Sequence, residues 1–426
     1  MIQIGRIDFM DNRQATLRWK QAVPRESYTF VAASLVNSIG SSLLWPLITI
    51  YVHNVLHRNY AEAGFALLLQ ALMGVLGQFV GGALYEKVGP KRLIVGSLLM
   101  TGFAQFSLIF AKAWVPYLIA MMIIGFLNQT TMPAVNAFVG FRWPQHRNQL
   151  FNLMYVSNNI GVAVGTSLAG LLASISFNLT FLFNGLTTIF FALFFYQYLR
   201  KLGLSLDQFI PFSGQAGEQS SLFSLLLNMR LYLFLAIGSL LTYLATSAWN
   251  SGAAPYLNQH GQPPSMYSWL WTVNGLVILL GQPFTSMLNR WLTKSLNSRL
   301  IASALFYACG FSVIWIRHSP YIWLMMGMII ATFGEMLMSP VVPAIITQTT
   351  GRNAAFYLGV VGSVGTVGRL VGPPYFGYLF DQKGISPILL AATVSSLLAA
   401  FSFIVFSWWL KQGTYAGEEQ NIPQSM

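Results

Sequence analysis

The chain has 426 residues, of which 55% are hydrophobic and only 8% are charged. Globular domains average about 25% charged residues, so this sequence cannot cover the water-exposed surface that its length would require. The composition therefore excludes an ordinary soluble fold and indicates a protein that crosses a membrane many times. The single cysteine, Cys309, excludes a disulfide framework and a cysteine-based zinc or iron–sulfur site.

The apolar stretches predict the helices. A helix that crosses the hydrocarbon core needs about 20 mostly apolar residues, and charge clusters and turn residues divide the chain into twelve such stretches. We place them at residues 29–52, 63–85, 93–111, 115–140, 149–174, 178–199, 231–254, 267–289, 300–316, 321–347, 354–380 and 386–410. The predicted fold class is therefore an all-α integral membrane protein with twelve transmembrane helices.

The basic residues predict the orientation. Eighteen of the 23 Lys and Arg residues fall on one side of the predicted spans, four fall on the other, and Arg369 lies inside a span. Because basic loops stay in the cytoplasm, we expect both termini there, in a multi-pass protein of the cell membrane. This rule also explains the net charge of +12, and no basic patch interleaved with aromatic residues points to nucleic acid.

The chain starts with a basic segment, residues 1–28, ahead of the first span. Its scattered apolar residues fit either an amphipathic piece on the inner membrane face or a disordered tail, and both interpretations stay open. The first span lacks a small-residue cleavage site behind a short apolar region, so we expect it to be retained rather than removed as a signal peptide.

The loop after the second span has a distinctive composition. It reads Gly82-Ala83-Leu84-Tyr85-Glu86-Lys87-Val88-Gly89-Pro90-Lys91-Arg92. Gly82 would allow a close helix crossing, and Glu86 could face a helix N-terminus, which we expect to be that of the eleventh span. The competing interpretation is a basic cytoplasmic loop with a tight Gly89-Pro90 turn.

Polar residues in the middle of apolar spans are candidates for a substrate site. Such residues either line a water-filled cavity or bond neighbouring helices, and the sequence leaves both roles open. We select as candidate substrate-binding residues Trp45 of the first span, Gln78 of the second, Asn128 and Gln129 of the fourth, Asn158 and Asn159 of the fifth, Trp249 and Asn250 of the seventh and Gln282 of the eighth.

The longest hydrophilic stretch divides the spans into six and six. The predicted parts are a basic segment (1–28), an N-terminal six-helix bundle (29–200), a linker (201–230), a C-terminal six-helix bundle (231–411) and a tail (412–426). Polar and glycine residues recur between the halves at a nearly constant spacing: Leu76-Gly77-Gln78 as Leu280-Gly281-Gln282, Arg147-Asn148 as Arg352-Asn353, and Gly161, Gly165 and Gly170 as Gly368, Gly372 and Gly377. The chain is therefore predicted to be a duplicated six-helix unit, in which Asn128 matches Glu335.

Two six-helix halves with both termini in the cytoplasm resemble the major facilitator superfamily. The segment from Gly82 to Arg92 resembles the signature loop of that superfamily, with Glu86 where Asp is usual and Pro90 where a base is usual. The counterpart around Arg290 lacks the acid. The resemblance implies a cytoplasmic gate that holds the outward-facing state, formed by Gly82, Glu86, Gly89, Lys91 and Arg92.

Glycines spaced four residues apart occur in the fifth and eleventh spans. Gly161, Gly165 and Gly170 resemble the glycine-rich motif of antiporter branches of the superfamily, with Thr166 in place of the usual proline, and the eleventh span has Gly368, Gly372 and Pro373. We assign these glycines and Pro373 to helix packing and bending. Small residues at this spacing are common in any membrane bundle, so the motif alone favours antiport only slightly.

Glu335 is the one acidic residue in the middle of a span; the other ten lie in tails, loops or span ends. A carboxylate facing lipid there would be costly. Either Glu335 forms a permanent buried ion pair with Arg369, or it carries a proton that Arg369 or a cationic substrate displaces. We favour proton coupling by Glu335 and Arg369, because the stretch around Glu335 resembles the Gly-Glu segment of proton-coupled multidrug exporters. Those exporters often have a second acid in the first half, which is missing here.

The sequence predicts a secondary transporter, resembling the drug:proton antiporter branch, that exports small hydrophobic compounds, including cationic ones, in exchange for protons. We expect a monomer in the lipid bilayer that is not an enzyme, holds no metal or cofactor, and uses the proton gradient, since it has no phosphate-binding loop. The alternatives are a proton symporter or facilitator for a polar nutrient such as a sugar or organic acid, and a membrane-embedded enzyme or receptor.

Overall fold

The protein is described here by a computed structural model, which places residues 24–44, 47–58, 60–201, 230–262, 264–317 and 321–419. Over these residues the chain is helical and contains no strand. The first half contains α2 (Arg25–Ser41), α3 (Ile48–Asn54), α4 (Tyr60–Val88), α5 (Pro90–Ser107), α6 (Trp114–Arg142), α7 (Arg147–Ile175) and α8 (Phe177–Lys201). The second half contains α10 (Arg230–Thr246), the π-helix η3 (Trp249–Ala253), α11 (Ala254–Gln259), α12 (Pro264–Leu280), α13 (Gln282–Trp291), α14 (Leu296–Ile316), α15 (Ile322–Thr349), the 3₁₀ turn η4 (Gly351–Asn353), α16 (Ala354–Lys383) and α17 (Ile385–Glu419).

Each of the twelve predicted spans corresponds to helical structure, and the all-α membrane fold is confirmed. In the described part of the chain, nine helical stretches are long and apolar enough to cross a bilayer. Three further spans complete the set. One consists of α2 and α3, and another consists of α12 and α13. The third is α5, which has 18 residues, with two bases directly after its first residue. Residues 45–46, between α2 and α3, lie outside the described residues, as do most of the predicted linker and the ends of the chain.

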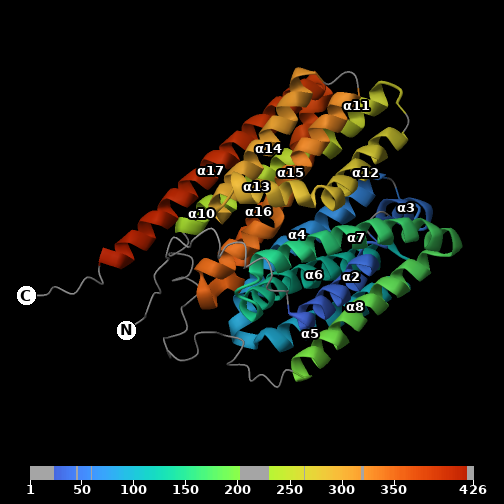
Figure 1. Ribbon diagram of the computed structural model, residues 1–426. Helices are drawn as coiled ribbons and strands as arrows, with labels where there is room; N and C mark the ends of the chain where they lie inside the picture. Colours follow the sequence, from blue (N-terminus) through green and yellow to red (C-terminus); the bar gives the residue numbers. More distant parts are fainter. Residues whose placement is uncertain are drawn as a thin grey trace, which may run out of the picture.

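The eighth span is broken, contrary to its prediction as one continuous helix over 267–289. α12 ends at Leu280 and α13 begins at Gln282, so the chain turns at Gly281 (Figure 1). Pro283 follows at the start of α13; proline has no N–H to continue the helix ladder, and its ring crowds the preceding turn.

The seventh span is also irregular, with a π-helical turn over Trp249–Ala253. Pro255 stands at the start of α11 and cannot donate to the carbonyl of Ser251. The wider π turn accommodates that missing hydrogen bond.

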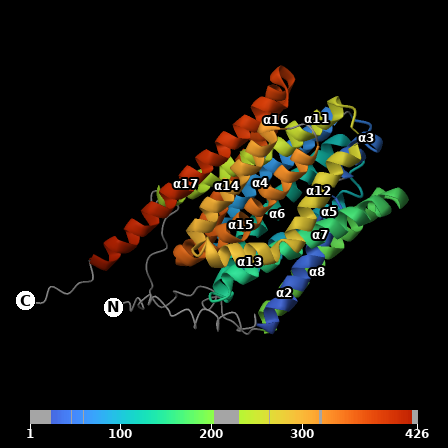
Figure 2. The same cartoon turned by 45° about the horizontal axis from the view of Figure 1, so that its top comes forward.

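The helices form two bundles that lie side by side. Figure 1 shows α2 to α8, in blue to green, against α10 to α17, in yellow to red. In the turned view of Figure 2, α17 still lies along one side of the molecule and α8 along the other. α4, α6 and α7 of the first bundle meet α12, α15 and α16 of the second, so these helices form the interface between the halves.

Glycines set the same helix crossing in both halves. Gly161 and Gly165 of α7 pack against Ser38, Ile39 and Ser42 of α2, with no room for a Cβ. At the related positions Gly368 and Gly372 of α16 pack against Leu240, Leu244 and Ser247 of α10. The repeated crossing reproduces in space the repeat that the sequence predicts.

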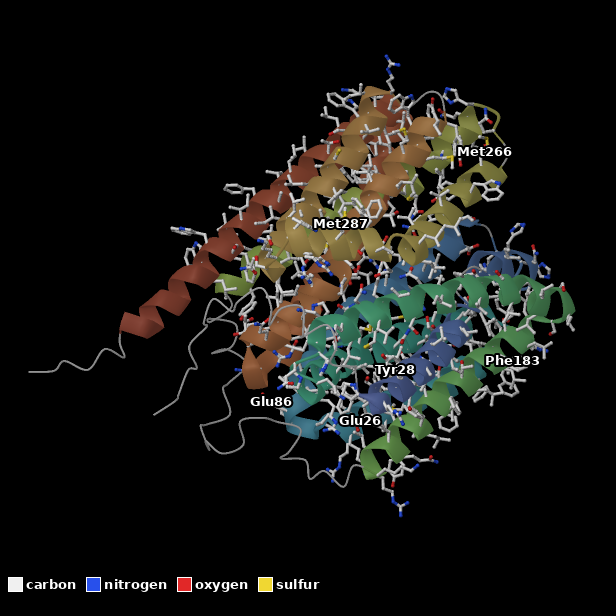
Figure 3. All side chains as sticks on the ribbon, in the orientation of Figure 1. Glu26, Tyr28, Glu86, Phe183, Met266 and Met287 are labelled. Carbon is white, nitrogen blue, oxygen red and sulfur yellow. The ribbon has the colours of Figure 1, made fainter. Side chains whose placement is uncertain are left out.

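We call the end of the molecule that carries most of the basic side chains the basic end; it holds Lys87, Lys91, Arg92, Arg142, Arg147, Arg200, Lys201, Arg290, Lys294 and Arg299. There Arg142 donates to Glu26 at 2.9 Å and the Trp143 indole donates to the same oxygen at 3.1 Å. Glu26 lies at the start of α2 (Figure 3), so this ion pair ties α2 to the end of α6.

Among the described residues, the two halves share a core only toward the basic end. One hydrophobic cluster there draws on both halves, including Phe138 and Val135 of α6 with Phe356 of α16. At the opposite end the clusters are confined to single halves: one around Tyr51 and Tyr117 in the first, and another around Trp249 and Phe311 in the second. The halves are therefore packed together at the basic end and packed separately at the other.

The outer surface is apolar along the middle of the helices. Exposed side chains include Leu72, Ile119, Phe190, Leu276 and Phe401. Phe183, on α8, projects from the edge of the bundle in Figure 3. A surface of this kind suits hydrocarbon and would be unfavourable in water.

Candidate functional site

Glu335 lies halfway along α15, part-buried where four helices converge. The side-chain amide of Asn274, from α12, donates to its Oε2 at 3.1 Å and to Thr332 Oγ1 at 2.9 Å. Thr332 lies one turn before Glu335 and donates its own proton to the carbonyl of Met328. A neutral amide therefore holds this carboxylate.

Two tyrosines complete the surroundings of Glu335. Tyr155 comes from α7 of the first half, and its buried hydroxyl lies close enough to interact electrostatically with the carboxylate, although it makes no hydrogen bond of standard geometry. Tyr307 comes from α14 and is buried. A Cβ on Gly334 would stand 3.0 Å from the Tyr307 ring, so the glycine lets α14 and α15 approach beside Glu335.

Arg369 lies in the middle of α16, exposed, with its guanidinium carbon 4.1 Å from the centroid of the Tyr243 ring. Over the described residues Arg369 forms no ion pair with Glu335, whereas Arg142 pairs with Glu26 and Arg58 pairs with Glu62. Tyr307 instead lies within electrostatic reach of both Glu335 and Arg369. The two charges do not neutralise each other directly, so this structure does not contain a permanent Glu335–Arg369 pair.

The repeat-related glutamines both connect the two halves. Gln78 of α4 donates to Gln129 of α6 at 2.8 Å and to Thr366 of α16 at 3.3 Å. Gln282 of α13 accepts a hydrogen bond from Asn152 of α7 at 3.0 Å. The arrangement therefore makes Gln78, Gln129 and Gln282 interhelical bonding groups in this conformation.

The asparagines of the first half are hydrogen-bonded or exposed, and Asn158 is both. Asn158 accepts a hydrogen bond from Ser38 at 2.8 Å, and Asn159 donates to the Tyr155 carbonyl at 2.9 Å. Asn128 is exposed. Val135, seven residues later and so on nearly the same face of α6, belongs to the hydrophobic cluster that the two halves share. Asn128 therefore points inward, toward the space between the halves.

The seventh-span candidates have different positions. Trp249 is buried against Phe311, with ring centroids 5.6 Å apart, so its indole packs the core of the second half in this structure. Asn250 is exposed and accepts a hydrogen bond from Tyr267 at 2.5 Å. Trp45 lies outside the described residues.

The loop between α4 and α5 meets the second half at the basic end. Gly82 packs against the backbone of Ala355 and Phe356, in the first turn of α16. Glu86 is one helical turn further along α4 and so on the same face; Figure 3 shows it beside the end of α16. This position is the helix N-terminus that the sequence indicates for Glu86.

The remaining loop residues shape the turn into α5. Gly89 has a φ of 84°, a left-handed conformation that favours glycine, and Pro90 starts α5. The Lys91 ammonium lies 4.6 Å from the centroid of the Tyr196 ring on α8, and Arg92 is exposed. Lys91 is therefore engaged within its own half.

Two of the residues assigned to helix packing have no such contacts. Gly170 has open space around the position of a Cβ, so it does not pack a neighbouring helix. Pro373 is exposed on α16, which continues through it. Its lack of an N–H leaves the carbonyl of Arg369 without its usual helical donor, which matches the bending role better than the packing role.

Sequence reasoning missed Asn274, Tyr155, Tyr307 and Tyr243. Asn274 has the signal that selected Gln282, a polar residue in the middle of an apolar span, and could have been found by it. The tyrosines give no such signal, because this chain has 18 of them. Across the described ranges, no three His, Cys, Asp or Glu side chains gather closely enough to hold a metal ion.

The comparisons with known proteins agree with this architecture. The family description of the Major Facilitator Superfamily matches residues 30–236 and again 235–424. The uncharacterized MFS-type transporter YttB of Bacillus subtilis (strain 168) is 32% identical over 405 residues, covering 94% of this chain and 100% of that protein. The quinolone resistance protein NorA of Staphylococcus aureus (strain MSSA476) is 22% identical, covering 90% of this chain and 96% of that protein.

Solved structures share the fold. The FucP transporter in its outward conformation superposes with a TM-score of 0.65 at 14% identity, covering 89% of this chain and 98% of that chain. The human organic anion transporter MFSD10 does so with a TM-score of 0.67 at 15% identity, covering 89% of this chain and 100% of that chain. The repeated six-helix halves, the family match over both of them and the full-length relative together show that this chain belongs to the major facilitator superfamily of membrane transporters.

Proposed function

We propose that this transporter exports hydrophobic compounds, including cationic ones, in exchange for protons. The observation that carries the proposal is Glu335: a mid-membrane carboxylate at the meeting point of the two halves, held by the Asn274 amide and by no basic side chain among the described residues. Intramembrane ionisable groups of this kind are typical of proton pathways.

Competition for Glu335 would couple the two fluxes. An ionised carboxylate that is bonded only to neutral donors is not neutralised by a basic partner. It can therefore attract a cation. Protonation removes that attraction, so a bound proton and a bound cation exclude each other. Exchange follows without any further cofactor, and the proton gradient supplies the energy.

Alternating access would expose Glu335 to each side in turn. We propose that the basic end faces the cytoplasm, as its Lys and Arg residues favour. The arrangement with the halves joined at the basic end would then be the outward-facing state. Protonation of Glu335 from outside would release the substrate, and loss of the proton to the cytoplasm would restore affinity for the next molecule.

The loop after α4 would form the cytoplasmic gate together with the amide side chains that bond the two halves to each other. Gly82 permits contact with the first turn of α16, and Glu86 lies near the positive end of that helix. The hydrogen bonds of Gln78 to Thr366 and of Asn152 to Gln282 would add specific links between the halves. Each can break and re-form at modest cost, as a gate requires.

The similarity to NorA, described as a quinolone resistance protein, supports drug export as the class of function. The aromatic surroundings of Glu335, with Tyr155 and Tyr307, suit a ring-containing guest.

The proposal is tested with purified protein in proteoliposomes under an imposed proton gradient. We expect a hydrophobic cationic dye to move against its own gradient, in the direction opposite to the protons, and to stop when an ionophore collapses the gradient. Proton-coupled uptake of a sugar or organic acid, moving with the protons and without dye movement, would assign the chain to the symporters. Dye movement that ignores the proton gradient would contradict the coupling.

A further inference from the structure

Arg369 has an unusual position for a charged residue. It lies near the middle of α16, is exposed, and forms no ion pair with any acidic side chain in the described part of the chain. A guanidinium that faced lipid at this depth would be costly. The position therefore requires water or a ligand beside it.

The direction of Arg369 follows from its neighbours on α16. Gly362, seven residues earlier, packs against the side chain of Gln78 from the other half, and Thr366 accepts a hydrogen bond from the same Gln78. Seven residues are about two helical turns, so Arg369 lies on nearly the same face as Gly362. Its side chain therefore follows the cross-half contact and faces the first half, where the cores have separated.

Tyr243 holds the guanidinium in a defined orientation. The Arg369 guanidinium carbon lies over the Tyr243 ring, 4.1 Å from its centroid, and Gly365, one turn before Arg369, leaves room for that ring. A guanidinium that packs against an aromatic ring keeps its N–H donors in its own plane. These donors remain free to bind a ligand beyond the edge of the ring. This geometry suits a carboxylate, which can accept two parallel hydrogen bonds from such a fork.

Glu335 and Arg369 both lie near Tyr307, each within its electrostatic reach. The site therefore presents one negative and one positive group, with an aromatic side chain near both. A ligand that satisfies both needs a cationic nitrogen, an aromatic body and an anionic group.

We propose that Arg369 binds the carboxylate of the substrate, and that the preferred substrates are amphoteric aromatic compounds carrying both a cationic nitrogen and a carboxylate. This inference rests on the proposed export function and specifies its substrate class. In it, Glu335 attracts the cationic end and competes with protons, while Arg369 supplies the selectivity for the anionic end.

The test uses two dyes that differ at one group. Rhodamine B has a cationic ring system and a free carboxylate, and its ethyl ester keeps the cation but lacks the carboxylate. Binding to detergent-purified protein is measured by fluorescence polarisation for wild type, Arg369→Gln, Arg369→Lys and the control Arg317→Gln. Arg317 is also exposed and lies 6.0 Å from the Trp323 ring, but it follows the end of α14, away from the site.

Wild type should prefer rhodamine B to its ester. Arg369→Gln should weaken rhodamine B binding about tenfold or more, the expected loss for a charge-assisted hydrogen bond, and leave ester binding unchanged. Arg369→Lys should recover part of the loss, and Arg317→Gln should match wild type. Unchanged ester binding also shows that the variant is folded.

Equal loss of both dyes in Arg369→Gln, or no loss of either, would overturn the inference. A wild type that prefers the ester would overturn it as well. A wild type that binds and exports the ester but not rhodamine B leaves proton-coupled export of cations standing and removes only the amphoteric substrate class. A wild type that binds neither dye removes both the inference and the export of hydrophobic cations.

Discussion

At the scale of single residues, the proposed proton coupling depends on the contacts that hold Glu335. Its carboxylate receives a hydrogen bond from Asn274 and lies beside Tyr155 and Tyr307, while Arg369 is engaged with Tyr243. The sequence singled out Glu335 and Arg369 because each is the one charge of its sign in the middle of a span. It could not supply their partners, because contacts among α7, α12, α14 and α15 depend on the rotation of each helix about its axis.

Asn274→Ala should weaken binding of a cationic dye, because the amide that orients the carboxylate is lost. We expect about a tenfold higher Kd, corresponding to one hydrogen bond to a charged group. Fluorescence polarisation with the ethyl ester of rhodamine B measures it. Asn178→Ala, at an exposed position in the turn into α8, is the matched control. Equal Kd values for Asn274→Ala and wild type would show that the amide does not position Glu335.

At the scale of elements, the apolar stretches of the sequence predicted the positions of the spans well. They predicted the interruptions within the seventh and eighth spans less well. Proline was read as a site of bending in α16, yet Pro283 and Pro255 were passed over, and these are the residues that interrupt the eighth and seventh spans. In the glycine motif, Gly161 and Gly165 pack against the neighbouring helix, but Gly170 has nothing beside it. The spacing of the glycines identifies one face of α7. How far along that face the glycines contact α2 depends on where the two helices diverge, and the sequence does not show this.

Gly165→Val should therefore destabilise the protein, because its side chain would collide with the Ile39 carbonyl and with Ser42. Overpacking of this kind costs about 1–3 kcal/mol, visible as a lower Tm in detergent. Gly170→Val, five residues along the same helix, should change the Tm much less, because it meets open space. The two variants share the loss of a helical glycine, so the difference between them isolates packing. A similar Tm for both would remove the α2–α7 contact from the account.

At the scale of the whole molecule, the two halves meet from the basic end to the middle and have separate cores beyond it. The duplication was visible in the sequence because polar and glycine residues recur in order. The conformational state was not visible in the sequence, because the same repeat is compatible with both the inward-facing and the outward-facing arrangement. Cross-half contacts such as Gly82 with Ala355 and Ser363 with Val75 define the state seen here.

Thiol labelling tests both this state and the orientation in the membrane. On a Cys309→Ser background, Asn128→Cys places one cysteine at an exposed, inward-pointing position in the middle of α6. A membrane-impermeant maleimide should label it from outside intact cells, and much more slowly in inside-out vesicles. A cysteine at Arg92, exposed at the basic end, should show the reverse preference. Faster labelling of Asn128→Cys from the cytoplasmic side would contradict the outward-facing assignment.

The central claim is that Glu335 carries the coupled proton, and Glu335→Gln in proteoliposomes tests it most directly. Addition of substrate should move protons in wild type and in Glu62→Gln, a control that removes a carboxylate paired with Arg58 near the opposite end. Glu335→Gln should show no substrate-driven proton movement while its Tm and elution profile stay those of wild type. Proton movement in Glu335→Gln equal to that of wild type would contradict the claim.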